Sequence, residues 1–237
     1  MDFLSLWRKL TQARRCVLCH DSALSDGLCA GCAQDLAAVF TDAANSCPLC
    51  FRQIAGGAVC GACQKKPPQY ARLWASVYYQ PPVSGMIHEF KHLADSGMCR
   101  PLAALMRRNA PDWLETARID CVLAMPLSKE RRFYRGFNQS EALTDALAAH
   151  YGWRVLPRGT VVRKHTPPQS TLKSEARRRN VKNIFELKNP LESNCNVLLI
   201  DDVTTTGATF AELAKTLKQS GVGQVYCWSL ARSQMKS

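Results

Sequence analysis

The sequence contains no apolar run that approaches the roughly 20 residues needed to cross a bilayer. Its first 15 residues, MDFLSLWRKLTQARR, lack the basic start, apolar stretch and small-residue cleavage site of a signal peptide. We therefore expect a globular, cytoplasmic protein without a transmembrane segment. Phe3, Leu6, Trp7 and Leu10 share one helical face, which predicts a short N-terminal helix docked on the protein itself. Association of this helix with the inner face of the membrane is the alternative.

Acidic residues are scarce: 19 Asp and Glu stand against 31 Lys and Arg, for a formal net charge of +12. Two zinc ions bound by eight thiolates would lower that charge by four, to about +8. The protein would still be clearly basic. A basic protein suits an anionic partner.

The cysteines form an internal repeat of the pattern C-x2-C-x9-C-x2-C, and the second copy follows the first by 31 positions. Two C-x2-C knuckles place four thiolates around one ion, which predicts two structural zinc sites with sequential pairing of the ligands. The spacing leaves iron–sulfur ligation open as an alternative. Disulfides do not suit a chain with no export signal. The proposed ligands are Cys16, Cys19, Cys29 and Cys32 in the first site and Cys47, Cys50, Cys60 and Cys63 in the second.

His20 adjoins a proposed ligand, and we interpret it as a bystander because four cysteines already complete each site. Closed sites leave no position for a substrate, so this half of the chain is expected to be a scaffold or docking module. The segment QKKPPQY, residues 64–70, is a stiff linker with paired prolines. It divides the predicted domains, 1–66 with the N-terminal helix and double zinc ribbon, and 70–237.

After the linker, apolar strand patterns alternate with helical ones, which predicts an α/β domain with a parallel sheet and helices on both faces. The expected strands are residues 72–79, 120–126, 158–164, 196–200 and 224–232. Helical segments are expected at 82–109, broken near Gly97, at 138–152 and at about 207–220.

The stretch VLLIDDVTTTGAT, residues 197–209, falls where such a sheet binds ligands, at the carboxyl end of a strand and the start of a helix. Hydroxyls and backbone amides of the Thr-Gly turn suit a phosphate at the helix N-terminus. Asp201 and Asp202 would repel a phosphate, but as hydrogen-bond acceptors they suit a vicinal diol. Diol and phosphate together indicate a ribose 5-phosphate.

Two other protein classes share part of this pattern. The chain has no G-x-x-x-x-G-K-[ST] segment, which excludes a P-loop ATPase despite the LLIDD stretch. A receiver domain carries its paired acids near its start, whereas only one expected strand follows them here. A threonine-rich helix cap alone does not explain the double acid.

The stretch 197–209 resembles the PRPP-binding motif of type I phosphoribosyltransferases. RGFNQSEALTDALA (135–148), HTPPQSTLKSEARRRNVKNIF (165–185) and SLAR (229–232) narrow the similarity to the ComF/GntX family, whose members carry a cysteine-rich metal module before a phosphoribosyltransferase domain. The resemblance spans nearly the whole chain. It implies a five-stranded parallel core with a small hood, bound PRPP and Mg²⁺, and a role in natural transformation or the use of DNA as a nutrient.

The resemblance also implies roles for individual residues. Asp201 and Asp202 would hold the ribose hydroxyls, directly or through the metal, and Arg135 would act with them at the catalytic centre. The loop 127–138 would face the pyrophosphate through Lys129, Arg131, Arg135 and Asn138. The 5-phosphate would be held by Val203, Thr204, Thr205, Thr206, Gly207, Ala208 and Thr209.

The stretch 158–182, which includes Arg177, Arg178 and Arg179, is the most basic part of the chain. It is interpreted as a loop that closes over the site or as a track for single-stranded DNA, with a solvated helix face as the plain alternative. His88, Lys91 and His92 are spaced for one helix and could line the hood, but ordinary surface histidines are the preferred interpretation.

Two classes of function follow. The protein is a transferase that displaces pyrophosphate from PRPP with a nitrogen base, or a non-catalytic single-stranded-DNA-binding adaptor that uses the PRPP site as a sensor of ligand or nucleotide ends. A helicase or uptake-machinery protein is expected to dock on the zinc-ribbon module. The sequence does not identify the acceptor.

Overall fold

The computed structural model describes residues 15–92, 96–164 and 183–233. The N-terminal helix and Arg177–Arg179 of the basic stretch lie outside the described residues. Within the described part, no helix has the length and apolar character to cross a membrane. Along the chain the elements are α2 (Ala30–Asp35), η1 (Leu36–Val39), η2 (Ala43–Asn45), η3 (Ala55–Gly57), α3 (Gly61–Lys65), β1 (Arg72–Tyr78), α4 (Val83–His92), η4 (Ser96–Met98), α5 (Cys99–Arg108), β2 (Cys121–Ala124), α6 (Lys129–Arg135), α7 (Gln139–Tyr151), β3 (Val161–Arg163), β4 (Phe185–Leu187), β5 (Val197–Thr204), α9 (Ala208–Gln219) and β6 (Val225–Arg232).

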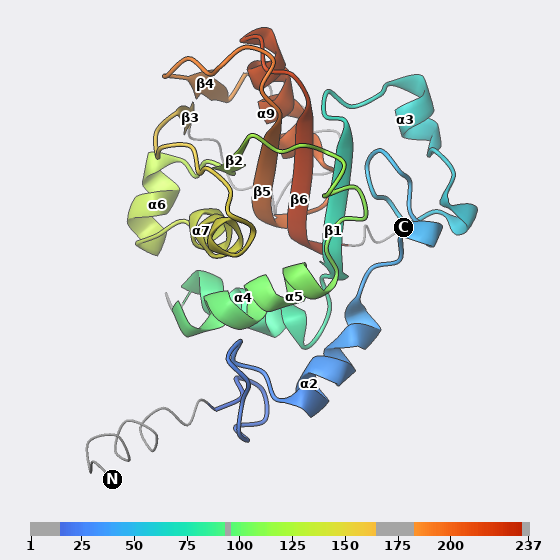
Figure 1. The fold of residues 1–237 in the computed structure, drawn as a ribbon, viewed down its shortest axis with the longest axis vertical. Helices are drawn as coiled ribbons and strands as arrows, with labels where there is room; N and C mark the ends of the chain where they lie inside the picture. The colour runs from blue at the N-terminus through green and yellow to red at the C-terminus, as the bar shows by residue number, and fades with distance from the viewer. Residues whose placement is uncertain (1–14, 93–95, 165–182, 234–237) are drawn as a thin grey trace.

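The centre of the protein is a four-stranded parallel sheet in the order β1-β6-β5-β2 (Figure 1). Its two central strands, β5 and β6, are almost entirely buried. Burial on both faces is the environment that long apolar runs such as VLLI favour. The prediction of an α/β fold with a parallel sheet, preceded by a cysteine-rich region, is confirmed.

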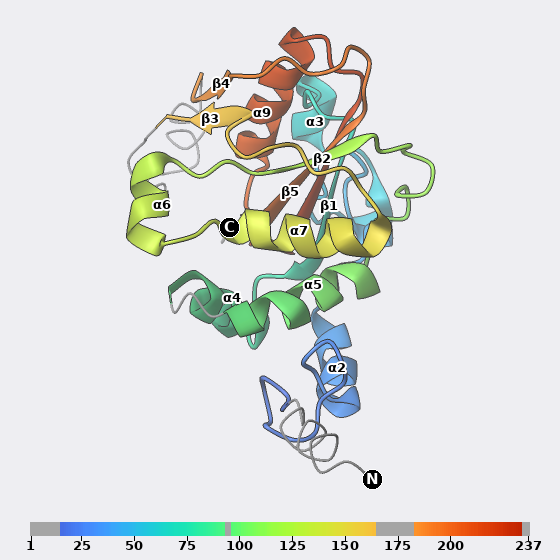
Figure 2. The same cartoon turned by 60° about the vertical axis from the view of Figure 1, so that its left-hand side comes forward.

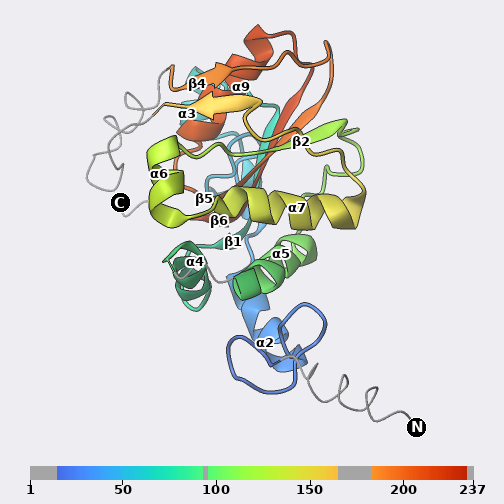
Figure 3. The same cartoon turned by 90° about the vertical axis from the view of Figure 1, so that its left-hand side faces the viewer.

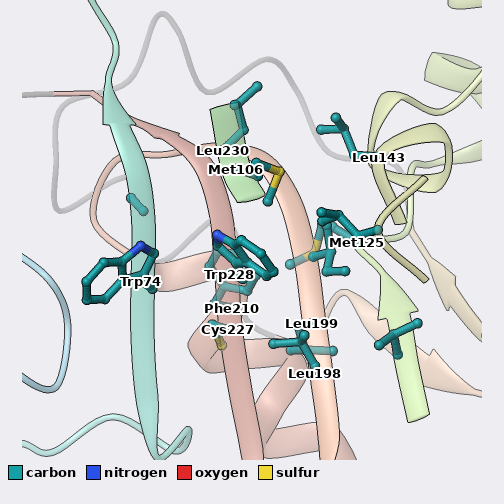
Figure 4. Close-up of a cluster of buried hydrophobic side chains, with 14 of the residues drawn as sticks. Trp74, Met106, Met125, Leu143, Leu198, Leu199, Phe210, Cys227, Trp228 and Leu230 are labelled. Atoms are coloured by element: carbon teal, nitrogen blue, oxygen red, sulfur yellow. The ribbon is translucent and has the colours of Figure 1, made fainter. Parts of the chain in front are cut away.

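Helices cover the sheet on both faces. Trp228 of β6 points toward α5 and α7: its indole N–H donates to Ser76 Oγ at 2.9 Å, and its ring lies 6.1 Å from that of Tyr151 at the end of α7. Side chains alternate along a strand, so the adjacent Cys227 points to the opposite face, against which α9 packs. Figures 2 and 3 show α5 and α7 side by side, and Figure 4 shows the buried core with Phe210 of α9.

The strand expected at 158–164 exists as β3, but it is not part of the parallel sheet. It pairs antiparallel with β4, which was not predicted. Four strands rather than five therefore form the described parallel sheet. Where a fifth strand would pair with β2, the chain forms only a single parallel bridge, between Val155 and Val122. The pairing stops there because Pro157 has no N–H to continue it and Gly159 turns the chain at φ 85°.

The segment 127–138, expected to be a loop, contains the helix α6. Ser128 caps its start by accepting a hydrogen bond from the Arg131 N–H at 3.4 Å. Gly136 ends it in the left-handed conformation at φ 79°. The basic side chains of this segment are therefore held on a rigid turn of helix.

The cysteine-rich part packs directly against the α/β part. Arg232, at the end of β6, donates to the Cys50 carbonyl oxygen at 2.9 Å, and the Phe51 ring lies 4.5 Å from the Trp74 ring of β1. Further along the chain toward the N-terminus, Asp26 pairs with Arg108 of α5 at 2.8 Å. The division into two domains between residues 66 and 70 stays a prediction.

Candidate functional site

The eight repeated cysteines come together as two groups of four, in the predicted sequential pairing. Within each group the sulfur atoms all lie within 4.8 Å of one another. Cys19 Sγ lies 3.6 Å from Cys29 Sγ, and Cys50 Sγ lies 3.7 Å from Cys60 Sγ. Four sulfurs at the Zn–S bond length of about 2.3 Å would be about 3.8 Å apart in a tetrahedron. The two clusters are therefore compatible with zinc sites.

In each cluster, backbone hydrogen bonds favour the thiolate form of the first cysteine. Burial opposes ionisation of Cys16, but hydrogen bonds from the backbone outweigh it and lower the pKa of this thiol to about 6. The same balance lowers the pKa of Cys47 to about 7. Thiolates are the form that binds a metal. His20 is in neither cluster, in agreement with its interpretation as a bystander.

The second candidate site lies where β5 ends. This strand was expected to stop at Ile200, but it continues through Asp201 and Asp202 to Thr204. Asp201 Oδ1 accepts hydrogen bonds from Ser140 Oγ and from the backbone N–H of Asp202, both at 2.9 Å. Asp202 Oδ2 lies 2.9 Å from Lys91 Nζ of α4. The two carboxylates are thus fixed by two different helices.

The turn after β5 is shorter than expected. Thr204 is a buried strand residue paired with Arg232, so it does not belong to the turn. The turn is made by Thr205, Thr206 and Gly207, and the Thr206 hydroxyl accepts a hydrogen bond from Ala208 N–H at 3.3 Å.

Gly207 has φ 75°, and a Cβ there would lie 2.8 Å from the buried Tyr70 hydroxyl oxygen. Only glycine fits this position, because both the conformation and the space exclude a side chain. Immediately after it α9 begins, and the first turn of a helix has N–H groups without an intrahelical acceptor.

A cavity of about 560 Å³ lies beside the two aspartates. It brings together parts of the chain more than 100 residues apart, because β2 and β5 are neighbours and their carboxyl ends meet at one edge. Of the predicted residues, those that line it are Asp201, Asp202, Val203, Thr209, Arg131, Arg135 and Asn138. The predicted residues that do not line it are Lys129, Thr204, Thr205, Thr206, Gly207 and Ala208.

Asn138 has a structural part in this site. Its side-chain oxygen caps α7 by accepting from Ser140 N–H at 3.1 Å, and its amide donates to the Met125 carbonyl at 3.1 Å. Both ends of the amide are therefore occupied. Asn138 fixes the start of α7, and with it the hydroxyl that holds Asp201.

Nine lining residues were absent from the predicted site, among them Lys91, Arg163 and Gln139. Lys91 was named only as a residue that could line the hood, and Arg163 only as part of the basic stretch. Gln139 lies within the RGFNQ motif, and this motif was the one available signal for it. Arg163 comes from β3, far from the motif in sequence, and nothing in the sequence places it beside the cavity. Lys91 comes from α4, and its helical spacing with His88 and His92 was the available signal for it.

The cations in the cavity are crowded. Burial, followed by the like charge of Arg131, lowers the pKa of Arg163, which is 9% exposed. Burial, followed by the like charge of Arg135, lowers the pKa of Arg131. Guanidinium groups held close together away from water favour an anion between them.

Gln139 has the one buried side-chain polar atom without a hydrogen-bond partner among the described residues, its amide nitrogen. The residue is 1% exposed, and its carbonyl oxygen accepts from Arg135 at 3.2 Å. A buried donor without a partner costs about 1–3 kcal/mol. A ligand oxygen in the cavity that Gln139 lines would remove this cost.

The surroundings of Asp201 disfavour the ionised form of its side chain. Burial, and then the neighbouring Asp202 carboxylate, raise the pKa of Asp201 to about 7. The folded protein therefore binds the Asp201 proton more tightly than the unfolded chain does. The folding stability gained from this proton is fully present below about pH 4 and is lost as the pH rises through 7.

We expect Asp201→Asn to become the more stable protein as the pH rises, by about 1–2 kcal/mol at pH 8. Asparagine keeps the oxygen that accepts from Ser140 and from Asp202 N–H, and it removes the buried charge. Urea unfolding of both proteins between pH 5 and pH 8 measures the difference. Parallel pH profiles would show that Asp201 is already ionised at acidic pH.

The chain is similar to proteins named for DNA utilization and for competence. It is 33% identical over 231 residues to the DNA utilization protein YhgH of Salmonella typhimurium, covering 94% of this chain and 99% of that protein. It is 31% identical over 231 residues to competence protein F of Haemophilus influenzae, covering 92% and 97%.

Other comparisons add little. No protein-family model matches the chain. The crystal structure of an adenine phosphoribosyltransferase aligns with 61% of this chain and 74% of its own, at 16% identity and a TM-score of 0.39. The sequence identity to YhgH and to competence protein F, over nearly their whole lengths, is decisive: this chain belongs to the ComF/GntX family.

Proposed function

We propose that the cavity binds 5-phosphoribosyl pyrophosphate (PRPP) together with Mg²⁺, and that the protein acts in the uptake or utilisation of DNA. The role in DNA handling follows the names of its relatives. The ligand follows from the chemistry of the lining residues. A cavity lined by both cations and carboxylates suits a molecule that carries both phosphates and a diol.

The observation that carries this proposal is the composition of the cavity beside Asp201 and Asp202. Four cationic side chains line it, from the three elements α4, α6 and β3: Lys91, Arg131, Arg135 and Arg163. The two aspartates would accept the ribose hydroxyls or hold Mg²⁺, which prefers carboxylate oxygens. The metal, when bound, would neutralise pyrophosphate charge.

The 5-phosphate would lie against the turn at Gly207 and the first N–H groups of α9, with the Thr209 side chain on the cavity side. Arg131 and Arg135 would face the pyrophosphate, where α6 presents them. The Gln139 amide would donate to a ligand oxygen. Lys91 would leave Asp202 or share it with the ligand, since both compete for the same carboxylate.

Calorimetric titration of PRPP with Mg²⁺ at pH 8 tests this proposal. The wild-type chain is expected to bind one PRPP, and Gln139→Ala is expected to bind it about 10-fold more weakly, because a donor to the ligand is lost. Gln219→Ala, an exposed glutamine at the end of α9, is the matched control and should bind as the wild type does. The proposal fails if PRPP releases no heat and does not protect the wild-type protein against thermal unfolding.

Release of pyrophosphate distinguishes the two classes of function. In a transferase, a nitrogen base displaces pyrophosphate through an oxocarbenium-like transition state, and the basic side chains stabilise the leaving charge. Release with a purine, a pyrimidine or single-stranded DNA would establish an enzyme and its acceptor. Tight PRPP binding without release would assign the site to sensing. The cytoplasmic location and the docking of a helicase or uptake-machinery protein on the cysteine-rich part stay predictions.

A further inference from the structure

Two adjacent aromatic residues on α6 are almost fully exposed. Phe133 is 94% exposed and Tyr134 is 85% exposed, against 52% or less for every other large hydrophobic residue described as exposed. Neither ring stacks on another aromatic side chain of the described residues. Exposed aromatic surface of this kind contributes nothing to folding and commonly marks a binding site.

The helix that carries these rings is basic and rigid. Four cations, Lys129, Arg131, Arg132 and Arg135, stand against one acid in α6. Arg132 is engaged with Glu141 of α7, which ties the helix to the domain. Caps at both ends fix its length. The two rings are therefore carried by a capped helix that is anchored to α7, and they lie among positive charges.

The aromatic pair is continuous with the cavity. Tyr134 lines the cavity together with Arg131 and Arg135, while Phe133 lies outside it. A ligand on α6 can therefore contact the Phe133 ring outside the cavity, then the Tyr134 ring, and place its end in the cavity. Figures 2 and 3 show α6 as the outermost helix beside the carboxyl end of β2.

We propose that α6 is a binding platform for single-stranded nucleic acid, on which unpaired bases stack on Phe133 and Tyr134 while the cations bind the phosphates. This inference rests on the proposed action on DNA, and it assigns the surface where the strand lies. Stacking of a base on an aromatic ring contributes about 1–3 kcal/mol and requires that the base be unpaired. The strand would lead its end toward the PRPP cavity.

A membrane is the strongest rival for an exposed basic and aromatic helix. An interfacial helix needs one continuous apolar face, whereas adjacent residues on a helix point about 100° apart. Phe133 and Tyr134 therefore offer two separate ring faces, and α6 has only seven residues. Two rings in different directions suit successive bases better than they suit a lipid surface.

The test is fluorescence anisotropy of a labelled oligo-dT strand with the full-length protein in PRPP-free buffer. Phe133→Ala is expected to weaken binding about 10-fold, and Phe133→Ala with Tyr134→Ala about 100-fold, as one and then two stacked bases are lost. Phe133→Tyr with Tyr134→Phe keeps both rings and should bind within about 2-fold of the wild type. Leu24→Ala, an exposed apolar residue of the cysteine-rich part, is the control for loss of apolar surface.

Three results would overturn the platform. The first is unchanged oligo-dT affinity in both alanine variants, and the second is equal affinity of the wild type for duplex and single-stranded DNA. The third is that the alanine variants lose binding to anionic phospholipid vesicles but keep DNA binding. Phe133 does not line the cavity, so Phe133→Ala should keep the PRPP affinity of the wild type. Loss of DNA binding with PRPP binding retained therefore tests the platform alone. Absence of PRPP binding in the wild type would instead defeat the proposed ligand and leave the DNA result standing.

Discussion

Replacement of Cys60 with serine is expected to destabilise the protein by more than about 4 kcal/mol, the range that loss of a structural metal produces. Cys29→Ser, at the equivalent position of the first repeat, is expected to cost about half as much. Both variants should lose one of two zinc ions. The difference arises from what each cluster supports in the α/β part of the protein.

The second cluster lies against the sheet itself. The Cys50 carbonyl receives the hydrogen bond of Arg232, a 6% exposed cation at the end of β6. The Leu49 carbonyl accepts from Leu73 N–H of β1 at 3.0 Å. Loss of this cluster therefore leaves a buried guanidinium without its partner, which adds to the cost of losing the metal. The described ion pair of the first cluster, Asp26 with Arg108, is partly exposed and contributes less.

Zinc content per chain and urea unfolding followed by tryptophan fluorescence measure the two effects. Cys99→Ser, a half-buried cysteine outside both clusters, is the control and should retain two ions. Equal destabilisation by Cys60→Ser and Cys29→Ser would show that the second cluster is not coupled to the sheet. Retention of two ions in either variant would contradict the ligand sets.

The sequence predicted the parallel sheet well because its strands are buried on both faces and therefore appear as apolar runs. It did not predict the partner of residues 161–163, because the apolar pattern identifies a strand and not the strand with which it pairs. The same limit explains the missed end of β5: Asp201 and Asp202 interrupt the apolar run, although ladder hydrogen bonds continue through them.

The helix α6 was missed for a different reason. Its seven residues are too few for a hydrophobic period, and its two aromatic side chains face solvent instead of a core. Ser128 and Gly136 were the available cap signals. Lys91 and Arg163 were not assigned to the site because only the folded chain places α4 and β3 at the carboxyl end of β5.

Asp201 and Asp202 are the acidic residues of the proposed PRPP site, and we expect replacement of both by asparagine to weaken PRPP binding at least about 100-fold. Two charged acceptors for ribose hydroxyls or Mg²⁺ are lost, and each charge-assisted hydrogen bond contributes about 1.5–3 kcal/mol. The fold should survive, because asparagine keeps the acceptors for Ser140 and for backbone N–H groups. Asp112→Asn, at the opposite edge of the sheet beside Arg72, is the matched control.

The most direct measurement is calorimetric titration of PRPP and Mg²⁺, at pH 8, into the wild type, Asp112→Asn and the Asp201→Asn/Asp202→Asn double variant. The pH is chosen because Asp201 is ionised above about pH 7. We predict one PRPP per chain in the first two proteins and no measurable saturation in the third. Wild-type affinity in the double variant, with its fold intact, would contradict the assignment of this cavity.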